Sequence, residues 1–576
     1  MFDFTDNIIH DSSVDWGGDS DLSSCCSRAY AAVGILIALS VSTAAHAEAP
    51  PLVAPPSPKF DIREFKVEGN SLLPEAEINS LVKPYIGQSR DFGDVQRALQ
   101  ALQDTYLKMG YSSVQVLLPE QEIERGVVTL HVVEQRIASI TVEGNEHYDD
   151  ANVLRTLPAL SEGVLPNMKE VQKSIRVANE NPSKQIAVLF KDNETDETAI
   201  DVTVKVIDDK PWKAFLTLDN TGNRETGHGR IGFGYQNYNL FNKDHRITVQ
   251  YLTNLHFPQN YFNPERKVNI LGGAYTIPFY EWGDSLDMIA GYSDVNSGTI
   301  AAGSISVTGK GVVLGVHYNH NFTKIEDYEH KLTAAFDYRA YRSDVLNNGV
   351  GTGLTPHVTA TPWSLTYAGQ WQQEDQQLSF SFGGSWNLIP NMVPHGGDNI
   401  YGGSPYLAED DFSKYNFSVD YIHPFAKTWQ YHISASGQFT GDHLIPGEQF
   451  RIGGMDSVRG WHESALSGDK GYRWSVEAIS PDFGKPIGEK VGLRGVIFVD
   501  KGWVNNNHGV DGTPTSTSSS KSIASIGAGL RGNYGKDFVA RFDYAYVVDG
   551  DITKDNPFGS REKSDMFGHI SLGWIW

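Results

Sequence analysis

From Trp212 to Trp576 the chain consists of segment after segment in which apolar and polar residues alternate. In KYNFSVDYI, for example, Tyr415, Phe417 and Val419 are separated by polar residues, and TWQYHISAS, RITVQYLTN, QLSFSF and FVARFDYAYV follow the same rule. Successive side chains of a β-strand point to opposite faces, so each segment predicts a strand with one apolar and one polar face. No other feature of this sequence restricts the fold as strongly.

The lengths of the connections distinguish a membrane barrel from a soluble sandwich, which would alternate as well. Short connections such as QED, HPFAK and GNYG alternate with long ones at 341–362, 387–414, 440–472 and 547–566. This pattern is typical of outer-membrane barrels, whose brief turns face the periplasm and whose long loops face outside. We predict sixteen strands, with starts near residues 213, 229, 245, 267, 284, 310, 329, 363, 376, 415, 428, 473, 491, 523, 536 and 567.

A sheet that spans a membrane must close, because the hydrocarbon holds no water to satisfy an open edge. We therefore predict a mainly β fold, with a 16-stranded antiparallel transmembrane β-barrel at residues 211–576 that contacts outer-membrane lipid and encloses an aqueous lumen. The final residues, HISLGWIW, place Trp574 and Trp576 on the lipid face. Outer-membrane barrels often end on an aromatic residue in this way. We interpret these two tryptophans as an insertion signal, with the barrel-assembly machinery as a partner during biogenesis.

The beginning of the chain predicts export and a tether. The apolar run AYAAVGILIALSVSTAA ends in AHA, which suits cleavage of a signal peptide, residues 1–47, after Ala47. A transmembrane anchor is the alternative, but this run is short for a bilayer span. Residues 1–27 hold six aspartates and no lysine, which points to a translation start downstream of Met1. The linker at 48–59 holds five prolines, which favour extended structure.

An internal repeat follows the linker. FKVEGNSLLPEAEI at 65–78 returns as ITVEGNEHYDDANV at 140–153, and in each copy a strand ends in Gly-Asn before a helix begins. We predict two small domains of order β-α-α-β-β, at 60–135 and 136–210. This order and the VEGN opening resemble the POTRA (polypeptide-transport-associated) domains of outer-membrane assembly and secretion proteins. An exposed sheet edge lets an extended client add itself as a further strand.

A charged residue fixes the direction of the thirteenth predicted strand, VGLRGVIFVD. Arg494 and Asp500 share one face of it, and because lipid does not hold an arginine, that face must line the lumen. The same parity places Glu477 of RWSVEAI in the lumen. Arg459, in GGMDSVRGW, lies on the glycine-hinged loop 440–472, which is long enough to fold inward. A guanidinium stabilises a carboxylate in a forked pair, so we predict that Arg459 pairs with Asp500. The alternative is that Arg459 holds only its own loop together.

Two short motifs resemble those of the superfamily of POTRA-bearing outer-membrane barrels. In that superfamily the arginine loop tucks into the barrel and contacts an aspartate of the wall, and tyrosine is more usual than tryptophan at the fourth position of the first motif. The first motif is VRGW, with Val458, Arg459, Gly460 and Trp461, and the second is FVDKG, with Phe498, Asp500 and Gly502.

Three further features resemble the transporters of two-partner secretion, the haemolysin-activator and haemagglutinin-transporter type, over residues 60–576. They are the presence of only two POTRA copies, the segment LDNTGNRETG and the hairpin AYTIPFYEWGDSLDMIAGYS. The resemblance implies a Gram-negative outer membrane, POTRA domains in the periplasm, and export of an unfolded, β-helical exoprotein such as a haemolysin, adhesin or contact-dependent toxin. We expect a monomer. The linker is too short for the pore-plugging helix that family members often carry.

Two other functions are alternatives to export. A barrel-assembly factor, which inserts other outer-membrane proteins, is the alternative, but five POTRA copies would be usual there. A passive porin or receptor has no need of POTRA domains.

Other chemistries find little support in the sequence. The net charge of −23 argues against a nucleic-acid partner, since phosphate binding needs a basic surface. Cys25 and Cys26 are the only cysteines, and both lie within the signal peptide. DGDITKDNPFG, from Asp549, resembles a calcium loop but has lysine where that loop needs glycine. No GxSxG marks an activated serine, and no glycine-rich loop is followed by Lys-Ser or Lys-Thr. We therefore expect no cofactor, no metal and no enzymatic activity.

Overall fold

The computed structural model describes residues 59–576, apart from 124, 197, 223–226, 256–267, 295–309, 343–345, 348–349, 352–357, 374, 389–407, 409, 427, 508–519 and 551–563. The described chain forms two compact units, which divide between Glu134 and Gln135. The predicted signal peptide, nearly all of the linker, and most of the calcium-like segment after Asp549 lie outside the described residues. Among the described helices, none is long and apolar enough to cross a membrane.

The first unit is a small α+β domain with a three-stranded sheet of order β2-β5-β4. Strand β2 runs parallel to β5, and β4 runs antiparallel to it. Helix α3 covers this sheet with a buried face, starts at a capping box formed by Asp91 and Asp94, and ends at Gly110 in the left-handed conformation. The elements are β1 (Phe60–Ile62), β2 (Glu64–Glu68), α2 (Glu75–Val82), η1 (Lys83–Tyr85), β3 (Gly87–Arg90), α3 (Phe92–Met109), β4 (Val114–Leu117) and β5 (Val127–Glu134).

The second small domain has the same arrangement, with sheet order β6-β8-β7, and belongs to the unit that also holds the barrel. Its first strand again runs parallel to the central strand, and its third runs antiparallel. The predicted order β-α-α-β-β is therefore present in both copies, and in the first copy a short additional sheet of β1 and β3 is added to it. The elements are β6 (Arg136–Glu143), α4 (Asp150–Arg155), α5 (Met168–Asn179), β7 (Lys184–Asp192) and β8 (Ala199–Asp208).

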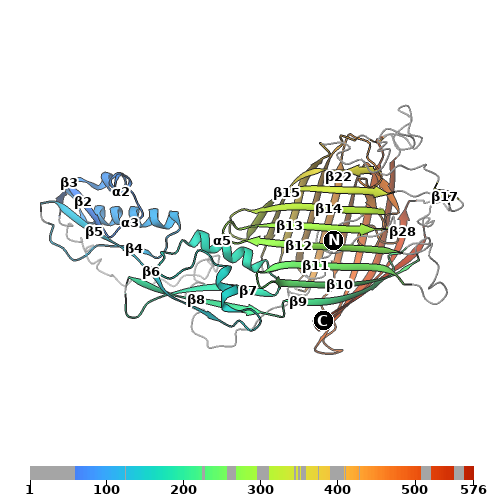
Figure 1. The fold of residues 1–576 in the computed structure, drawn as a ribbon, viewed down its shortest axis with the longest axis horizontal. Coiled ribbons are helices and arrows are strands. Elements are labelled where there is room, and N and C mark those ends of the chain that lie inside the picture. Colours follow the sequence, from blue (N-terminus) through green and yellow to red (C-terminus); the bar gives the residue numbers. More distant parts are fainter. Residues whose placement is uncertain are drawn as a thin grey trace, which may run out of the picture. The chain divides into compact units, whose positions relative to one another are not determined.

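The rest of the described chain forms one closed antiparallel barrel, whose strands run side by side in Figure 1. Sixteen strands span it, as the alternation predicts, and the short β18 (Val358–Ala360) extends β19 beyond a break at Pro362. They are β9 (Trp212–Asp219), β10 (Gly229–Leu240), β11 (His245–Leu255), β12 (Asn269–Phe279), β13 (Asp284–Ser293), β14 (Lys310–Asn321), β15 (Tyr328–Arg342), β19 (Trp363–Gln372), β20 (Gln377–Trp386), β21 (Ser413–Ala426), β22 (Trp429–Phe439), β25 (Lys470–Ile479), β26 (Val491–Asn505), β27 (Ser520–Tyr534), β28 (Phe538–Asp549) and β29 (Met566–Ile575).

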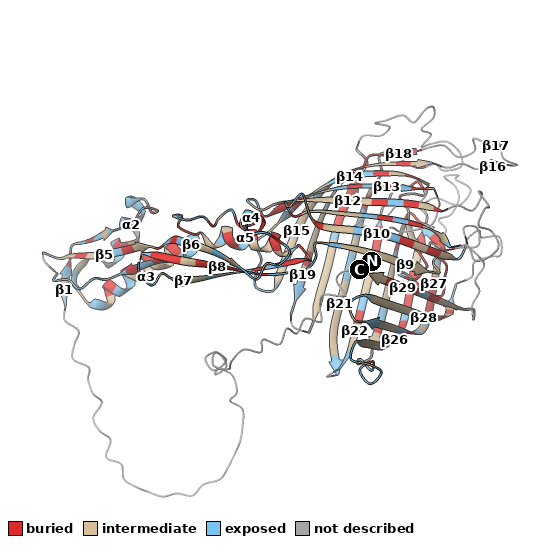
Figure 2. Cartoon of the chain, turned by 60° about the horizontal axis from the view of Figure 1, so that its bottom comes forward, coloured by how far each residue is buried: buried red, intermediate tan, exposed pale blue. Residues whose placement is uncertain are grey.

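The two faces of the barrel wall differ as expected for a wall between lipid and lumen. Outward side chains are apolar and exposed, for example Ile497 at 60%, whereas inward side chains such as Glu477 are polar and buried. Exposed and buried residues consequently alternate along single strands, as the colours of Figure 2 show. Burial on the inner face requires something inside the barrel, because a water-filled lumen would leave these polar groups accessible.

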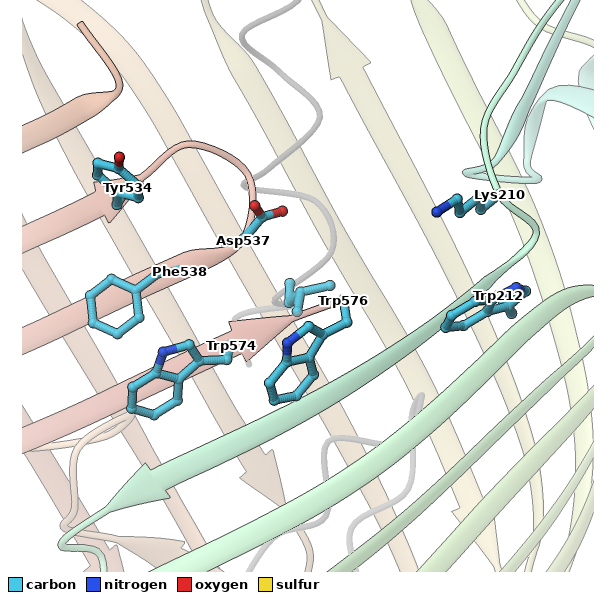
Figure 3. A pocket seen from close by; sticks show the side chains of 8 residues that line it. Lys210, Trp212, Tyr534, Asp537, Phe538, Trp574 and Trp576 are labelled. Carbon is cyan, nitrogen blue, oxygen red and sulfur yellow. The ribbon is translucent and has the colours of Figure 1, made fainter. Parts of the chain in front are cut away.

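The barrel closes where its last strand meets its first. Five residue pairs join β29 to β9, from Ser571↔Asp219 to Ile575↔Phe215, and the backbones of Trp576 and Ala214 exchange two further hydrogen bonds. The two predicted insertion residues, Trp574 and Trp576, lie on the outer side of this seam together with Trp212, as Figure 3 shows. Aromatic side chains at this level suit a membrane interface.

Candidate functional site

The connection between β22 and β25 fills part of the barrel interior. We call its residues 440–469 the lumen loop. It contains a two-stranded hairpin, β23 (Phe450–Ile452) and β24 (Leu466–Gly468), whose tip carries the first predicted motif. Gly453 and Gly454 adopt φ values of +101° and +115°, which side chains other than glycine rarely tolerate. The glycines thus let the loop reverse direction inside the barrel.

Arg459 at this tip lies against the wall aspartate that the sequence predicted as its partner. Its Nε donates to Oδ2 of Asp500 at 2.7 Å, and its Nη2 donates to Oδ1 of the same carboxylate at 2.7 Å. The backbone N–H of Arg459 also donates to Oδ2, at 3.0 Å. The resulting pair is the forked arrangement that suits a guanidinium and a carboxylate. Because β26 supplies Asp500, this contact joins the loop to the barrel wall.

A second carboxylate binds the other side of the guanidinium. Arg459 Nη1 donates to Oε1 of Glu477 on β25 at 2.5 Å, and Nη2 donates to the hydroxyl of Ser475 at 3.0 Å. His432 on β22 contacts the remaining oxygen of Glu477 at 3.2 Å. Each of the three guanidinium nitrogens of Arg459 therefore donates to a partner on the wall. Arg459 is only 2% exposed, so the pair is shielded from water, in contrast to the aqueous environment predicted from the width of the barrel.

Three further charged residues of the wall complete a cluster that the sequence did not single out. Asp543 on β28 lies 3.8 Å from Arg459 and accepts hydrogen bonds from Arg531 at 2.7 Å and from Arg541 at 2.7 Å. Arg541 also donates to Asp456 of the lumen loop at 2.6 Å. Their inward parity could have indicated them, but parity alone does not tell which inward charges meet.

Apolar packing surrounds this polar cluster. Val458 and Trp461 are fully buried and pack with wall residues, including Val504 on β26. The ring of Phe498 lies under the guanidinium of Arg459, 3.4 Å from the ring centre, as in a cation–π contact. At Gly502 a β-carbon would come within 3.1 Å of Val458. Glycine there allows the loop to approach the wall closely.

Gly460 forms a further link between the loop and the wall. Its φ of +89° is in the left-handed region, and its N–H donates to Nε2 of His569 on β29 at 3.0 Å. That nitrogen must therefore be unprotonated, and neutral His569 carries its proton on Nδ1. His569 was not recognised in the sequence because it precedes the apolar C-terminal residues without any motif.

Arg494 lies on the same face of β26 as Asp500 but outside the cluster. Its side chain is exposed and donates to Gln430 at 3.3 Å. Among the described residues, no group of three histidines, cysteines or acidic residues could hold a metal ion. What this site can do chemically is hold a loop inside the barrel through ion pairs.

Two profiles of known protein families match the chain. A profile of the family described as haemolysin secretion/activation protein ShlB/FhaC/HecB matches residues 197–532. A second profile, of the ShlB-type POTRA domain, matches residues 60–135. Matches to both profiles are what a transporter with periplasmic POTRA domains and an outer-membrane barrel would show.

Individual relatives are distant but match along most of their length. Outer membrane transporter CdiB of Escherichia coli is 22% identical over 479 residues, which cover 79% of this chain and 76% of that protein. Heme/hemopexin transporter protein HuxB of Haemophilus influenzae is 21% identical, with coverage of 86% and 85%.

Solved structures show the same fold. CdiB from Escherichia coli superimposes with a TM-score of 0.67 at 19% identity, over 92% of this chain and 93% of the other. CdiB from Acinetobacter baumannii gives a TM-score of 0.63 at 16% identity, over 91% of each chain.

Proposed function

The chain belongs to the haemolysin secretion/activation protein family, and from this membership we propose that it exports one unfolded exoprotein from the periplasm through its barrel. It is an outer-membrane transporter of two-partner secretion with periplasmic POTRA domains, and it is not an enzyme. The finer steps are our proposal: the POTRA domains capture the client, and the client, a large β-helical exoprotein, passes the lumen in extended form.

One observation carries the proposal. The closed barrel holds a loop in its interior through a compact set of ion pairs centred on Arg459 and Asp500. The barrel wall closes through its own strand pairs and does not require a loop in its interior. A loop that lay outside the barrel would not need to bury an arginine against the wall. An occupant whose attachment to the wall depends on ion pairs, beside its apolar contacts, can be displaced when another chain enters and competes for those charges.

The POTRA domains offer suitable edges for capture. In both sheets the third strand, β4 or β7, pairs on one side only with the central strand among the described elements. Its other side can accept an extended peptide through backbone hydrogen bonds, which read no side chains and so tolerate many client sequences. We propose the boundaries 60–135 and 136–210 for these domains and 211–576 for the barrel, with the chain working as a monomer.

Secretion assays test the proposal. The client is sought as a large exoprotein encoded beside this chain, and its amount in the medium is measured. Arg459→Ala and Asp500→Ala should each reduce secretion by about tenfold or more, because breaking a buried ion pair costs ~3–5 kcal/mol. Arg494→Ala is the matched control, since it removes an exposed arginine from the same wall face. Normal secretion by both variants at equal barrel abundance would contradict the role of the pair.

A depletion experiment separates export from the alternative. If loss of this chain lowers many outer-membrane barrels while the exoprotein still reaches the medium, the chain is a barrel-assembly factor. If the exoprotein alone remains in the periplasm, export is supported.

A further inference from the structure

Glu448, in the first half of the lumen loop, is a buried carboxylate that contacts a different part of the barrel wall from Arg459. It is 1% exposed. Arg339 on β15 donates from Nη1 to its two oxygens at 3.0 and 2.8 Å, and Lys414 on β21 lies 2.7 Å from Oε2. The hydroxyl of Tyr341 donates to Oε1 at 2.7 Å. Glu448 thus receives two cations and one neutral donor, all from the barrel wall.

The backbone at Glu448 is held as well. Its carbonyl oxygen accepts from Lys414 at 3.1 Å and from Gln438 on β22 at 3.0 Å. Behind the two cations, Asp337 on β15 accepts from Arg339 at 2.8 Å, so two carboxylates balance two cations here. A satisfied and neutral set of this kind is stable when buried, whereas removal of Glu448 would leave the cations without their main partner.

Apolar contacts seat the same stretch of the loop. Leu444 packs against Ala360 and Phe412, and Ile445 packs with Val358. The loop therefore meets this part of the wall through both polar and apolar groups, as it does around Arg459.

The two attachment sites lie on different parts of the wall. Glu448 contacts β15, β21 and β22, whereas Arg459 contacts β25, β26 and, through Asp543, β28. In the strand order of the barrel these are two separate sectors, which meet only between β22 and β25. The lumen loop is thus fixed at both sectors, and release at one leaves it attached at the other.

We propose that two latches hold the lumen loop, the first formed by Arg459 and Asp500 and the second by Glu448 with Arg339 and Lys414, and that the pore opens fully only when both latches are released. This inference rests on the proposed export function, because it describes how the same loop leaves the path of the client. The second latch is made of residues outside both sequence motifs.

Conductance of the purified full chain in planar lipid bilayers tests the second latch. Glu448→Gln keeps the shape and removes the charge, and should raise the open fraction several-fold. Glu463→Gln is the matched control, because the carboxylate of Glu463 accepts an N–H from Met455 within the loop itself. An open fraction for Glu448→Gln equal to that of the Glu463→Gln control would overturn the proposal.

Two combined variants make the test independent of any single substitution. Arg339→Gln should raise the open fraction as Glu448→Gln does, and the double variant should add little, because both remove one contact. Glu448→Gln with Asp500→Asn should exceed either single variant, because both latches are weakened. Additive effects of Arg339→Gln and Glu448→Gln would mean that they do not form one latch.

The conductance result is separable from the export result. If the wild-type chain secretes no exoprotein, the proposed function fails, but the conductance of its variants still reports on the loop. If secretion works and Glu448→Gln conducts like its control, only the second latch fails. Barrel folding of each variant is checked by its heat-dependent electrophoretic migration.

Discussion

The two small domains repeat one fold and differ in what they bury. In both, a glycine of the VEGN turn has a left-handed backbone, and a β-carbon there would clash with the central strand, at Val132 O for Gly69 and Val206 O for Gly144. In both, a carboxylate at the end of the central strand accepts backbone N–H groups from the residues directly after the VEGN turn. Glu134 accepts from Ser71, and Asp208 accepts from three successive residues. The repeat has thus kept its turn chemistry.

The two domains differ at the first residue of β4 and β7, the strands that run antiparallel to the central strand of each sheet. Val114 is paired with Glu134 in the first domain, and Lys184 is paired with Asp208 at the same place in the second. Both side chains are buried. Lys184 Nζ donates to Asp244 at 2.5 Å, in the turn between barrel strands β10 and β11.

That turn binds the second domain through several groups. Asp244 also accepts from Asn152 of α4 at 2.9 Å and, within the barrel, from Tyr280 between β12 and β13 at 2.6 Å. Arg176 of α5 donates to the carbonyl of Asn321, the last residue of barrel strand β14, at 3.0 Å. A buried lysine needs a partner, and here the partner comes from the barrel. The same fold therefore serves as an independent unit or as a docked one, depending on a few interior residues.

Transferring the lysine to the first domain should have the largest effect. Val114→Lys buries an ammonium group in a domain that has no counterpart of the barrel turn with Asp244. It should destabilise that domain by roughly 5 kcal/mol at neutral pH. Hydrogen exchange of the purified protein should show lost protection in peptides of α3 and β5, with β7 and β8 unchanged. Val114→Met is the control for size. Retained protection in the Val114→Lys variant would mean that the site tolerates a charge.

Removing the lysine from the second domain should have the next largest effect. Lys184→Met leaves Asp244 buried without its cation, which costs ~3–5 kcal/mol. We expect faster hydrogen exchange in β7 and in the turn that contains Asp244. Lys191→Met, at an exposed position of the same strand, is the matched control. Equal exchange in the two variants would show that the ion pair does not stabilise the docked domain.

Interior contacts of this kind are also the features that the sequence does not predict. Period-2 alternation predicts the sixteen strands because every strand carries it independently. The VRGW motif and strand parity together predict the contact of Arg459 with Asp500, and the structure brings these residues together. Strand parity gives the inward direction of Asp543 but not its partners, and Glu448 and Lys184 gave no signal, because each depends on a partner set by tertiary structure. Lys184 meets Asp244 60 residues later, and Glu448 meets Arg339 109 residues earlier.

The dryness of the Arg459 site was beyond sequence reasoning for the same reason. A lumen-facing arginine in a 16-stranded barrel is expected to be wet. Only the course of the lumen loop, with Val458 and Trp461 packed on the wall, removes the water.

A double variant tests whether Lys184 and Asp244 are energetically coupled. Replacing a buried ion pair by apolar residues is often close to neutral, whereas removing one partner is costly. Lys184→Met with Asp244→Leu should therefore recover ~1–3 kcal/mol relative to Lys184→Met alone, within the range of coupling between contacting residues. The same hydrogen-exchange peptides report the recovery. No recovery would indicate that Asn152 and Tyr280, which also bind Asp244, dominate the docking.

The smallest effect concerns a tyrosine that each domain buries. Burial raises the pKa of Tyr106 to about 12 and that of Tyr148 to about 12. The folded state keeps the phenol proton to higher pH than the unfolded state, so ionisation of the tyrosine in the unfolded state lowers the free energy of unfolding at alkaline pH. The domain therefore has its full stability below pH ~10 and loses part of it as pH rises from ~10 towards ~12. Tyr106→Phe should remove this alkaline loss in the first domain only. Below pH 10 it should cost about 1 kcal/mol, since Tyr106 donates to Asn70 at 2.7 Å.

Tyr148→Phe is the reciprocal variant, and the pair of variants assigns the alkaline transition to one domain at a time. Hydrogen exchange rises steeply with pH by itself, so protection is compared with the wild type at each pH. If Tyr106→Phe leaves the alkaline loss of protection in α3 unchanged, the transition in the first domain belongs to another group. If both variants abolish it in both domains, the domains do not unfold separately, and the contrast between an independent and a docked copy fails.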